Sequence, residues 1–349
     1  MQQYDYSRTY EIHMDVAGKQ ETHEGSRPLQ TLIWYPAQQT SSQRITYGAY
    51  LALFATEEQF SQMPSEAAET LREKETYYQA DADPALPMWA IRDAPPDNRT
   101  FPLVLYAPSD NAPAFENADL CEYLASEGYV VIASPSVGAR SFNVSGGIED
   151  AEAEAGDISF LIGFAHSIAQ VDLSNIALVG YGTGGLANLT VVARDGRISA
   201  LIALDVSNPV FSIPTKTSNH VRPHNTKIPL LLFDRGEITI GTIDKGKFEA
   251  SGVLLDEMAH SDVYAVRMDE LGRGGFSSMQ LRSPAYWKRQ PPQVYSPQEM
   301  LESYGWMARY LLAFLNWTFK HDTSAQMFLK SELPPRTGPR VVRRGSSPD

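Results

Sequence analysis

The chain has 349 residues, 43% of them hydrophobic, so it can bury a sizeable core in one large α/β domain or two smaller ones. Its 42 acidic residues outnumber 29 basic ones, and the net charge of -13 opposes binding to nucleic acid or anionic lipid. The single cysteine, Cys121, excludes an internal disulfide and lies at helical spacing with Leu124, so we expect a small buried side chain there.

No stretch approaches the roughly 18 uninterrupted apolar residues of a membrane-spanning helix. The first ten residues, MQQYDYSRTY, also lack the apolar core of a secretion signal. We therefore expect a protein that is soluble as given and has no membrane span.

The N-terminal part predicts two strands, at residues 9–16 and 29–36, as a β extension before the main domain. Residues 47–80 are expected to be helical. Their second part, 56–80, is charged with few apolar positions, which is typical of a solvated cap or excursion rather than a core helix.

From residue 101, short apolar runs alternate with helical segments, a pattern typical of βαβ units around a parallel sheet buried on both faces. We predict one α/β domain over residues 1–335, with a doubly wound, mostly parallel sheet and a disordered tail at 336–349. The predicted strands are FPLVLYA, YVVIASP, IALVGYG, ALIALDV, IPLLLFD and VYAVRM, and the predicted helices are 116–127, 150–169, 185–195, 245–260 and 297–321.

The segment IALVGYGTGGLANL predicts a buried strand, a tight glycine turn and a helix, and two chemistries use that arrangement. In the first, G-x-S-x-G presents a serine nucleophile on a sharp strand-to-helix elbow. Residues 180–184 match this frame, but Gly182 occupies the serine position. Thr183 follows it as the first helical residue, and Tyr181 precedes it.

In the second chemistry, G-x-G-x-x-G brings backbone amides close to the pyrophosphate of a dinucleotide. Gly180, Gly182 and Gly185 satisfy this spacing, and Asp205 lies about 20 residues further on, where a ribose-binding acid is expected. Such a fingerprint normally opens its domain, whereas this turn follows at least two parallel strands. Its position therefore favours the elbow, and the dinucleotide site stays an alternative.

Several segments in this order resemble serine hydrolases of the platelet-activating-factor acetylhydrolase and dienelactone hydrolase type, over roughly residues 8–330. The resemblance implies the α/β-hydrolase fold and carboxylic ester hydrolysis without a cofactor. The segments that carry it are LIWYPA, FPLVLYAPS, ENADLCEYLASEGYVVIASPS, GYGTGG, LIALD and RGGFSS.

The resemblance places the nucleophile at Gly182, the acid of the triad at Asp205 and the histidine of an H-x-x-F motif at Arg273. A glycine has no side chain with which to attack a carbonyl carbon, and arginine stays protonated because its pKa exceeds about 12. Only Asp205 keeps the residue type that the family uses. We therefore expect no serine-hydrolase activity from this triad.

The oxyanion hole of the family corresponds to the amide of Thr183 and to the loop around Ser109 and Asp110. We expect the elbow to keep its shape, because glycine tolerates the backbone conformation that an elbow requires. With Tyr181, these residues would line a pocket for a small apolar or ester-like molecule. A bidentate ion pair between Asp205 and Arg273 is a further prediction.

An enzyme with relocated catalytic residues is the second hypothesis, with Ser109, Ser134 or Ser136 as nucleophile near strand ends. Asp234 is the alternative acid. The sequence has no Cys/His cluster with metal-site spacing, and we expect no metal. His260 is expected at the end of a helix, and His166 inside a helix as a packed or surface residue. His220 and His224 are expected in a loop, with a spacing that fits no standard metal site.

Overall fold

The computed structural model describes residues 1–16, 19–57, 60, 64–78, 81–145, 147–205, 225–235, 260–289, 295–330 and 340–344. At 12–16, 19–22, 64, 235, 273 and 340–344 it describes the backbone alone.

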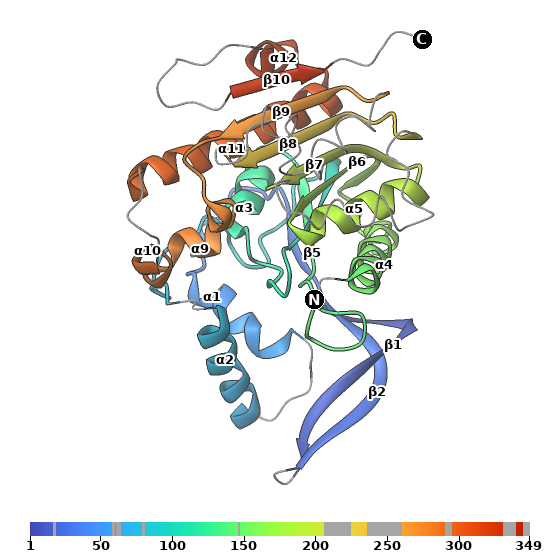
Figure 1. The fold of residues 1–349 in the computed structure, drawn as a ribbon, viewed down its shortest axis with the longest axis vertical. Helices are drawn as coiled ribbons and strands as arrows, with labels where there is room; N and C mark the ends of the chain where they lie inside the picture. The colour runs from blue at the N-terminus through green and yellow to red at the C-terminus, as the bar shows by residue number, and fades with distance from the viewer. Residues whose placement is uncertain are drawn as a thin grey trace, which may run out of the picture.

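Alternating strands and helices follow an N-terminal hairpin (Figure 1). The strands are β1 (Gln2–Val16), β2 (Lys19–Gln30), β3 (Leu32–Trp34), β4 (Phe101–Ala107), β5 (Val130–Ala133), β6 (Val171–Tyr181), β7 (Ile198–Leu204), β8 (Leu230–Arg235), β9 (Val263–Met268) and β10 (Arg340–Arg344). The helices are α1 (Gly48–Leu51), η1 (Ala52–Thr56), α2 (Pro64–Tyr78), α3 (Ala118–Ser126), α4 (Ile148–Ala165), α5 (Thr183–Arg194), η4 (Arg273–Phe276), α9 (Ser278–Arg282), α10 (Pro284–Arg289), α11 (Pro297–Lys320) and α12 (Thr323–Lys330).

The central sheet has eight described strands in the order β10-β9-β8-β7-β6-β4-β5-β3. The six strands from β9 to β5 in this order pair in parallel, and the two edge strands β3 and β10 pair antiparallel to their neighbours. The predicted doubly wound, mostly parallel sheet is confirmed.

Each face of the sheet carries its own core. Along β4, Leu103 and Leu105 face one core, which α4 and α5 cover, while Val104 and Tyr106 face the other, which α3 and α11 cover. Because both faces are buried, the parallel strands consist of nearly continuous apolar residues, as the sequence indicated. Cys121 lies buried in α3 as a free thiol.

The N-terminal prediction is only partly right. Residues 9–16 do form a strand, but it is the end of β1, which pairs antiparallel with β2 in a separate two-stranded ribbon. The predicted strand at 29–36 is wrong as a single element, because β2 ends at Gln30 and β3 begins at Leu32 in the main sheet. Thr31 separates them, and its amide donates to the carbonyl of Met1.

The helical prediction for residues 47–80 agrees with α1, η1 and α2, which lie beside one another at one end of the molecule (Figure 1). The predicted helix 245–260 lies outside the described residues except for His260. The tail expected to be disordered from residue 336 contains β10, so that expectation is wrong for these five residues. Two adjacent valines in RVVRR favour a strand, and β9 offers an edge with which it pairs.

One buried arginine joins the ribbon to the main domain. Arg27 in β2 is 1% exposed and donates to both carboxylate oxygens of Asp157 in α4, at 2.7 and 2.6 Å. Its Nη1 donates to the carbonyl of Gly138, and Nη2, which also bonds Asp157, donates to the carbonyl of Val137. Arg8 in β1 contacts the same carboxylate. The position of the ribbon therefore depends on a side-chain network that is largely shielded from water.

Candidate functional site: an elbow without a nucleophile

The glycine turn lies where an α/β sheet usually binds its ligand. From β4 the chain continues to β5 on one side and then to β6 on the other, so the strand order reverses between β4 and β6. Ligand sites of open α/β sheets lie at the carboxyl ends of the strands beside such a reversal. Ala107 at the end of β4 is the register partner of Gly180, which brings the loop after β4 beside the turn after β6.

The turn has the shape that the sequence predicted for an elbow. Gly182 alone separates β6 from α5, with φ 55° and ψ -123°, a backbone conformation that ordinary residues adopt only at a cost of about 1–3 kcal/mol. Its amide donates to the carbonyl of Leu204 at 3.4 Å, and its own carbonyl accepts from Gly185 at 3.1 Å. The strained geometry persists although no nucleophile is present.

The three glycines of the motif have different roles. A Cβ atom at Gly180 would lie 2.5 Å from the amide nitrogen of Gly185, and one at Gly184 would overlap the carbonyl oxygen of Ala107. Those two positions must be glycine for α5 to pack against the strands. A Cβ at Gly182 would only contact Ser109, at 3.5 Å. There is room for a side chain at the nucleophile position.

The other two residues that the resemblance assigns to a triad lie on segments that come close to the elbow. Asp205 directly follows β7, is 3% exposed and has φ 55°. Arg273 begins η4, whose Phe276 ring lies 6.2 Å from the ring of Tyr181. The side chain of Arg273 lies outside the described residues, so its pairing with Asp205 stays a prediction.

The region expected to stabilise an oxyanion carries a carboxylate. Asp110 accepts a hydrogen bond from the hydroxyl of Thr183, the first residue of α5. A negative charge at this helix terminus opposes an oxyanion and also opposes the pyrophosphate of a dinucleotide. We therefore do not propose a dinucleotide site.

A buried glutamate that the sequence analysis overlooked organises the loop after β4. Glu116 accepts from the amide of Ser109 at 2.9 Å, from the hydroxyl of Ser109 at 2.5 Å and from the hydroxyl of Tyr106 at 2.9 Å. The amide of Ser109, which lies in the loop expected to contribute to the oxyanion hole, is thus already engaged. The only signal in the sequence was an acidic residue in the otherwise uncharged stretch APAFEN.

Burial raises the pKa of Glu116 to about 7, even though the hydrogen bonds from Ser109 and Tyr106 favour the charged form. The negative charge of Asp110 contributes to this increase. Near neutral pH this carboxyl group can therefore both accept and release a proton.

The raised pKa predicts a pH dependence of stability. The native state keeps the Glu116 proton up to about pH 7, whereas the unfolded chain releases it near its ordinary value of 4.5. The stability from this proton is therefore complete below pH 4.5 and is lost as the pH rises through 7. The Glu116→Gln variant cannot titrate at this position. Between pH 4.5 and 7, the free energy of unfolding of the wild type should therefore fall by about 3 kcal/mol more than that of the variant. Urea titrations at several pH values measure the difference, and parallel curves would contradict it.

The remaining candidates lie at the ends of other strands, on the surface or outside the described residues. Ser134 and Ser136 follow β5 and are buried, and Ser136 donates to Glu154 at 3.3 Å. His166 caps α4 on the surface beside Arg197, and His260 is exposed. Asp234 is buried near the end of β8. His220 and His224 lie outside the described residues.

Within the described ranges, no group of three or more His, Cys, Asp or Glu side chains is arranged to hold a metal ion. In the same ranges no helix is long and apolar enough to cross a bilayer.

Comparison with known proteins supports the fold and no finer assignment. No protein-family model matches the sequence, and no curated protein matches it. A ferulic acid esterase from Streptomyces cinnamoneus has a similar solved structure, with a TM-score of 0.60 and 16% sequence identity over 90% of each chain. Together with the sheet order and the elbow at the end of β6, this similarity shows that the chain has the α/β-hydrolase fold.

Proposed function

We propose that this protein is a non-catalytic relative of the α/β hydrolases that binds a small ester-like or apolar molecule above the elbow. The observation that carries the proposal is Gly182, which keeps the elbow conformation but has no side chain with which to attack. The platelet-activating-factor acetylhydrolase and dienelactone hydrolase resemblance belongs to the same proposal. It places Arg273, which cannot act as a base, at the histidine position.

The electrostatics beside the elbow support the absence of hydrolysis. The Ser109 amide is engaged by Glu116, and the carboxylate of Asp110 lies at the start of α5. An acyl-transfer transition state develops negative charge, and preorganised donors normally stabilise it. Here the Ser109 amide is already occupied, and the negative charge of Asp110 lies next to Thr183, whose amide is the other expected donor.

A fluorophosphonate probe tests the proposal, because it reacts covalently with activated serines whatever the true substrate is. We expect the intact mass of the wild-type protein to stay unchanged after prolonged exposure. Phenyl acetate or a small lactone should still shift the NMR signals of the elbow, without being hydrolysed. Stoichiometric labelling or turnover of these probes would contradict the proposal.

A second function, hydrolysis by a relocated nucleophile, is favoured by one contact. Ser109 lies next to the empty position at Gly182, and its hydroxyl donates to Glu116, whose pKa is raised to about 7. Attack of the Ser109 oxygen on an ester carbonyl would transfer the serine proton to Glu116. The same proton would then pass to the departing alkoxide, leaving an acyl-serine that water hydrolyses.

The probe separates the two functions. Labelling that maps to Ser109, disappears in Ser109→Ala and follows an apparent pKa near 7 in the wild type would establish the relocated enzyme. Glu116→Gln should then slow labelling by roughly 10²–10⁴-fold, the usual contribution of a general base. Labelling that persists in Ser109→Ala would exclude this serine.

A further inference from the structure

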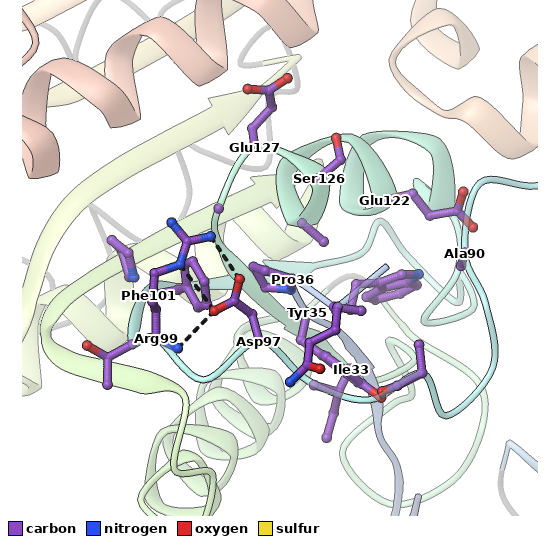
Figure 2. A pocket seen from close by; sticks show the side chains of 18 of the residues that line it. Ile33, Tyr35, Pro36, Ala90, Asp97, Arg99, Phe101, Glu122, Ser126 and Glu127 are labelled. Atoms are coloured by element: carbon purple, nitrogen blue, oxygen red, sulfur yellow. Dashed lines mark hydrogen bonds and ion pairs between the residues drawn. The ribbon is translucent and has the colours of Figure 1, made fainter. Parts of the chain in front are cut away.

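A cavity lies at the opposite edge of the sheet from the elbow. Its volume is about 1010 Å³, the upper end of the range for small-molecule sites. Figure 2 shows it beside Phe101, which begins β4, and Tyr35, which follows β3. Asp172 at the start of β6 and Lys320 at the end of α11 also line it. The cavity therefore lies at the amino ends of the parallel strands, and the elbow lies at their carboxyl ends.

Aromatic surface is available at this cavity. Trp89 is among its lining residues and is 70% exposed, an unusual fraction for so large an apolar side chain. The Arg44 guanidinium lies 4.7 Å from the centre of the Trp89 ring system. The backbone of Trp89 is held in place, because its amide donates to the buried carboxyl group of Glu122 at 2.7 Å. An exposed indole on a fixed backbone is a preorganised platform for stacking.

Polar groups around the cavity are held in defined orientations. The carboxylate of Asp97 accepts from the backbone amide of Arg99 at 2.9 Å and from its guanidinium at 3.1 and 2.8 Å (Figure 2). These bonds lower the pKa of Asp97 to about 2, so it stays charged. Three side-chain amides add planar donors and acceptors, those of Gln38, Gln39 and Asn175.

The charge of the lining opposes an anionic ligand. Among the described residues that line the cavity, four are acidic (Asp97, Glu122, Glu127 and Asp172) and two are basic (Arg99 and Lys320). Lys320 donates to the carbonyl of Glu127 at 2.9 Å, and Arg99 is paired with Asp97. Both of these cations already have partners within the protein. The Arg44 guanidinium on Trp89 adds a third positive charge beside the cavity, so these acidic residues still outnumber the basic ones, four to three.

From this combination we propose that the amino-edge cavity binds a neutral carbohydrate. A pyranose ring has an apolar face of C–H groups that stacks on an indole, and neighbouring hydroxyls that pair with carboxylates, guanidinium and amide groups in the plane of the ring. An exposed tryptophan, oriented polar groups and no surplus positive charge match those requirements. The site is independent of the function of the elbow.

Isothermal titration with cellotetraose, xylotetraose and maltotetraose tests the proposal on the full chain. At least one should bind, and Trp89→Ala should weaken it by about tenfold or more, as expected for loss of a stacking anchor. Asp97→Asn should weaken binding as well. Tyr77→Ala removes an aromatic residue that is 60% exposed and does not line the cavity, so it should leave affinity unchanged.

Three outcomes would overturn the proposal. The first is that none of the three oligosaccharides binds at about 10 mM, a concentration at which millimolar affinities are still detected. The second is that binding survives Trp89→Ala in a variant whose circular dichroism spectrum shows that it is folded. The third is that an oligogalacturonide, which is anionic, binds more tightly than the neutral sugars.

Discussion

The Gly182→Ser, Arg273→His double variant should react stoichiometrically with a fluorophosphonate probe, while the wild-type elbow should remain unlabelled. The backbone at position 182 already has the elbow conformation, and a Cβ atom there makes only ordinary contact with Ser109. Asp205 follows β7 as the acid of the restored triad. The two substitutions would thus supply the nucleophile and the base without changing the packing of α5.

The reaction of the double variant should nevertheless be slow. Loss of one oxyanion donor typically lowers such rates by about 10²–10³-fold, and the Ser109 amide is held by Glu116. Asp110→Asn in the same background removes the charge beside Thr183 and should therefore accelerate labelling. Intact-mass time courses measure both rates.

Single variants are the controls for the double variant. Gly182→Ser alone should label far more slowly, because arginine cannot take the serine proton. Arg273→His alone should not label at position 182, which still lacks a nucleophile. If the folded double variant stays unlabelled, either η4 does not bring position 273 to the elbow or the elbow cannot stabilise the reaction, and our view of the site would be wrong.

Arg27→Ala should lower the free energy of unfolding by about 3–5 kcal/mol, because it removes one partner of a buried ion pair. Arg27 and Asp157 are 1% and 2% exposed at their side chains, and two hydrogen bonds join them. The substitution leaves a buried carboxylate and two carbonyl groups with fewer donors. Urea denaturation measures the loss.

Arg8→Ala is the matched control, since Arg8 contacts the same carboxylate but is 25% exposed. Water can replace part of its interaction, so its loss should cost about 1 kcal/mol or less. Adding Asp157→Ala to Arg27→Ala should recover part of the stability by removing the unpaired charge. Equal effects of the two arginine variants would show that burial does not set the strength of this contact.

The α/β core was predictable because the signals for its strands and helices lie within short stretches of the sequence. Apolar runs such as FPLVLYA and IALVGYG are typical of strands buried on both faces, and the intervening segments are long enough for helical crossovers. The division of residues 29–36 between two strands was not predictable, because the composition of this segment suits a strand in either sheet. The change from β2 to β3 depends on the contacts of the ribbon with α4, to which Arg27 contributes.

The sequence by itself determined that residue 182 is glycine and that residue 273, which the resemblance places at the histidine position, is arginine, because residue identity does not depend on folding. It also determined the elbow, since Gly180 and Gly184 mark a strand-to-helix turn. Only the tertiary structure decided how the surroundings act. Glu116 reaches Ser109 because the segment between β4 and α3 folds back on itself, and Asp110 reaches Thr183 because β4 and β6 are neighbours in the sheet. The amino-edge cavity likewise exists only in the fold, since its lining comes from segments far apart in the sequence.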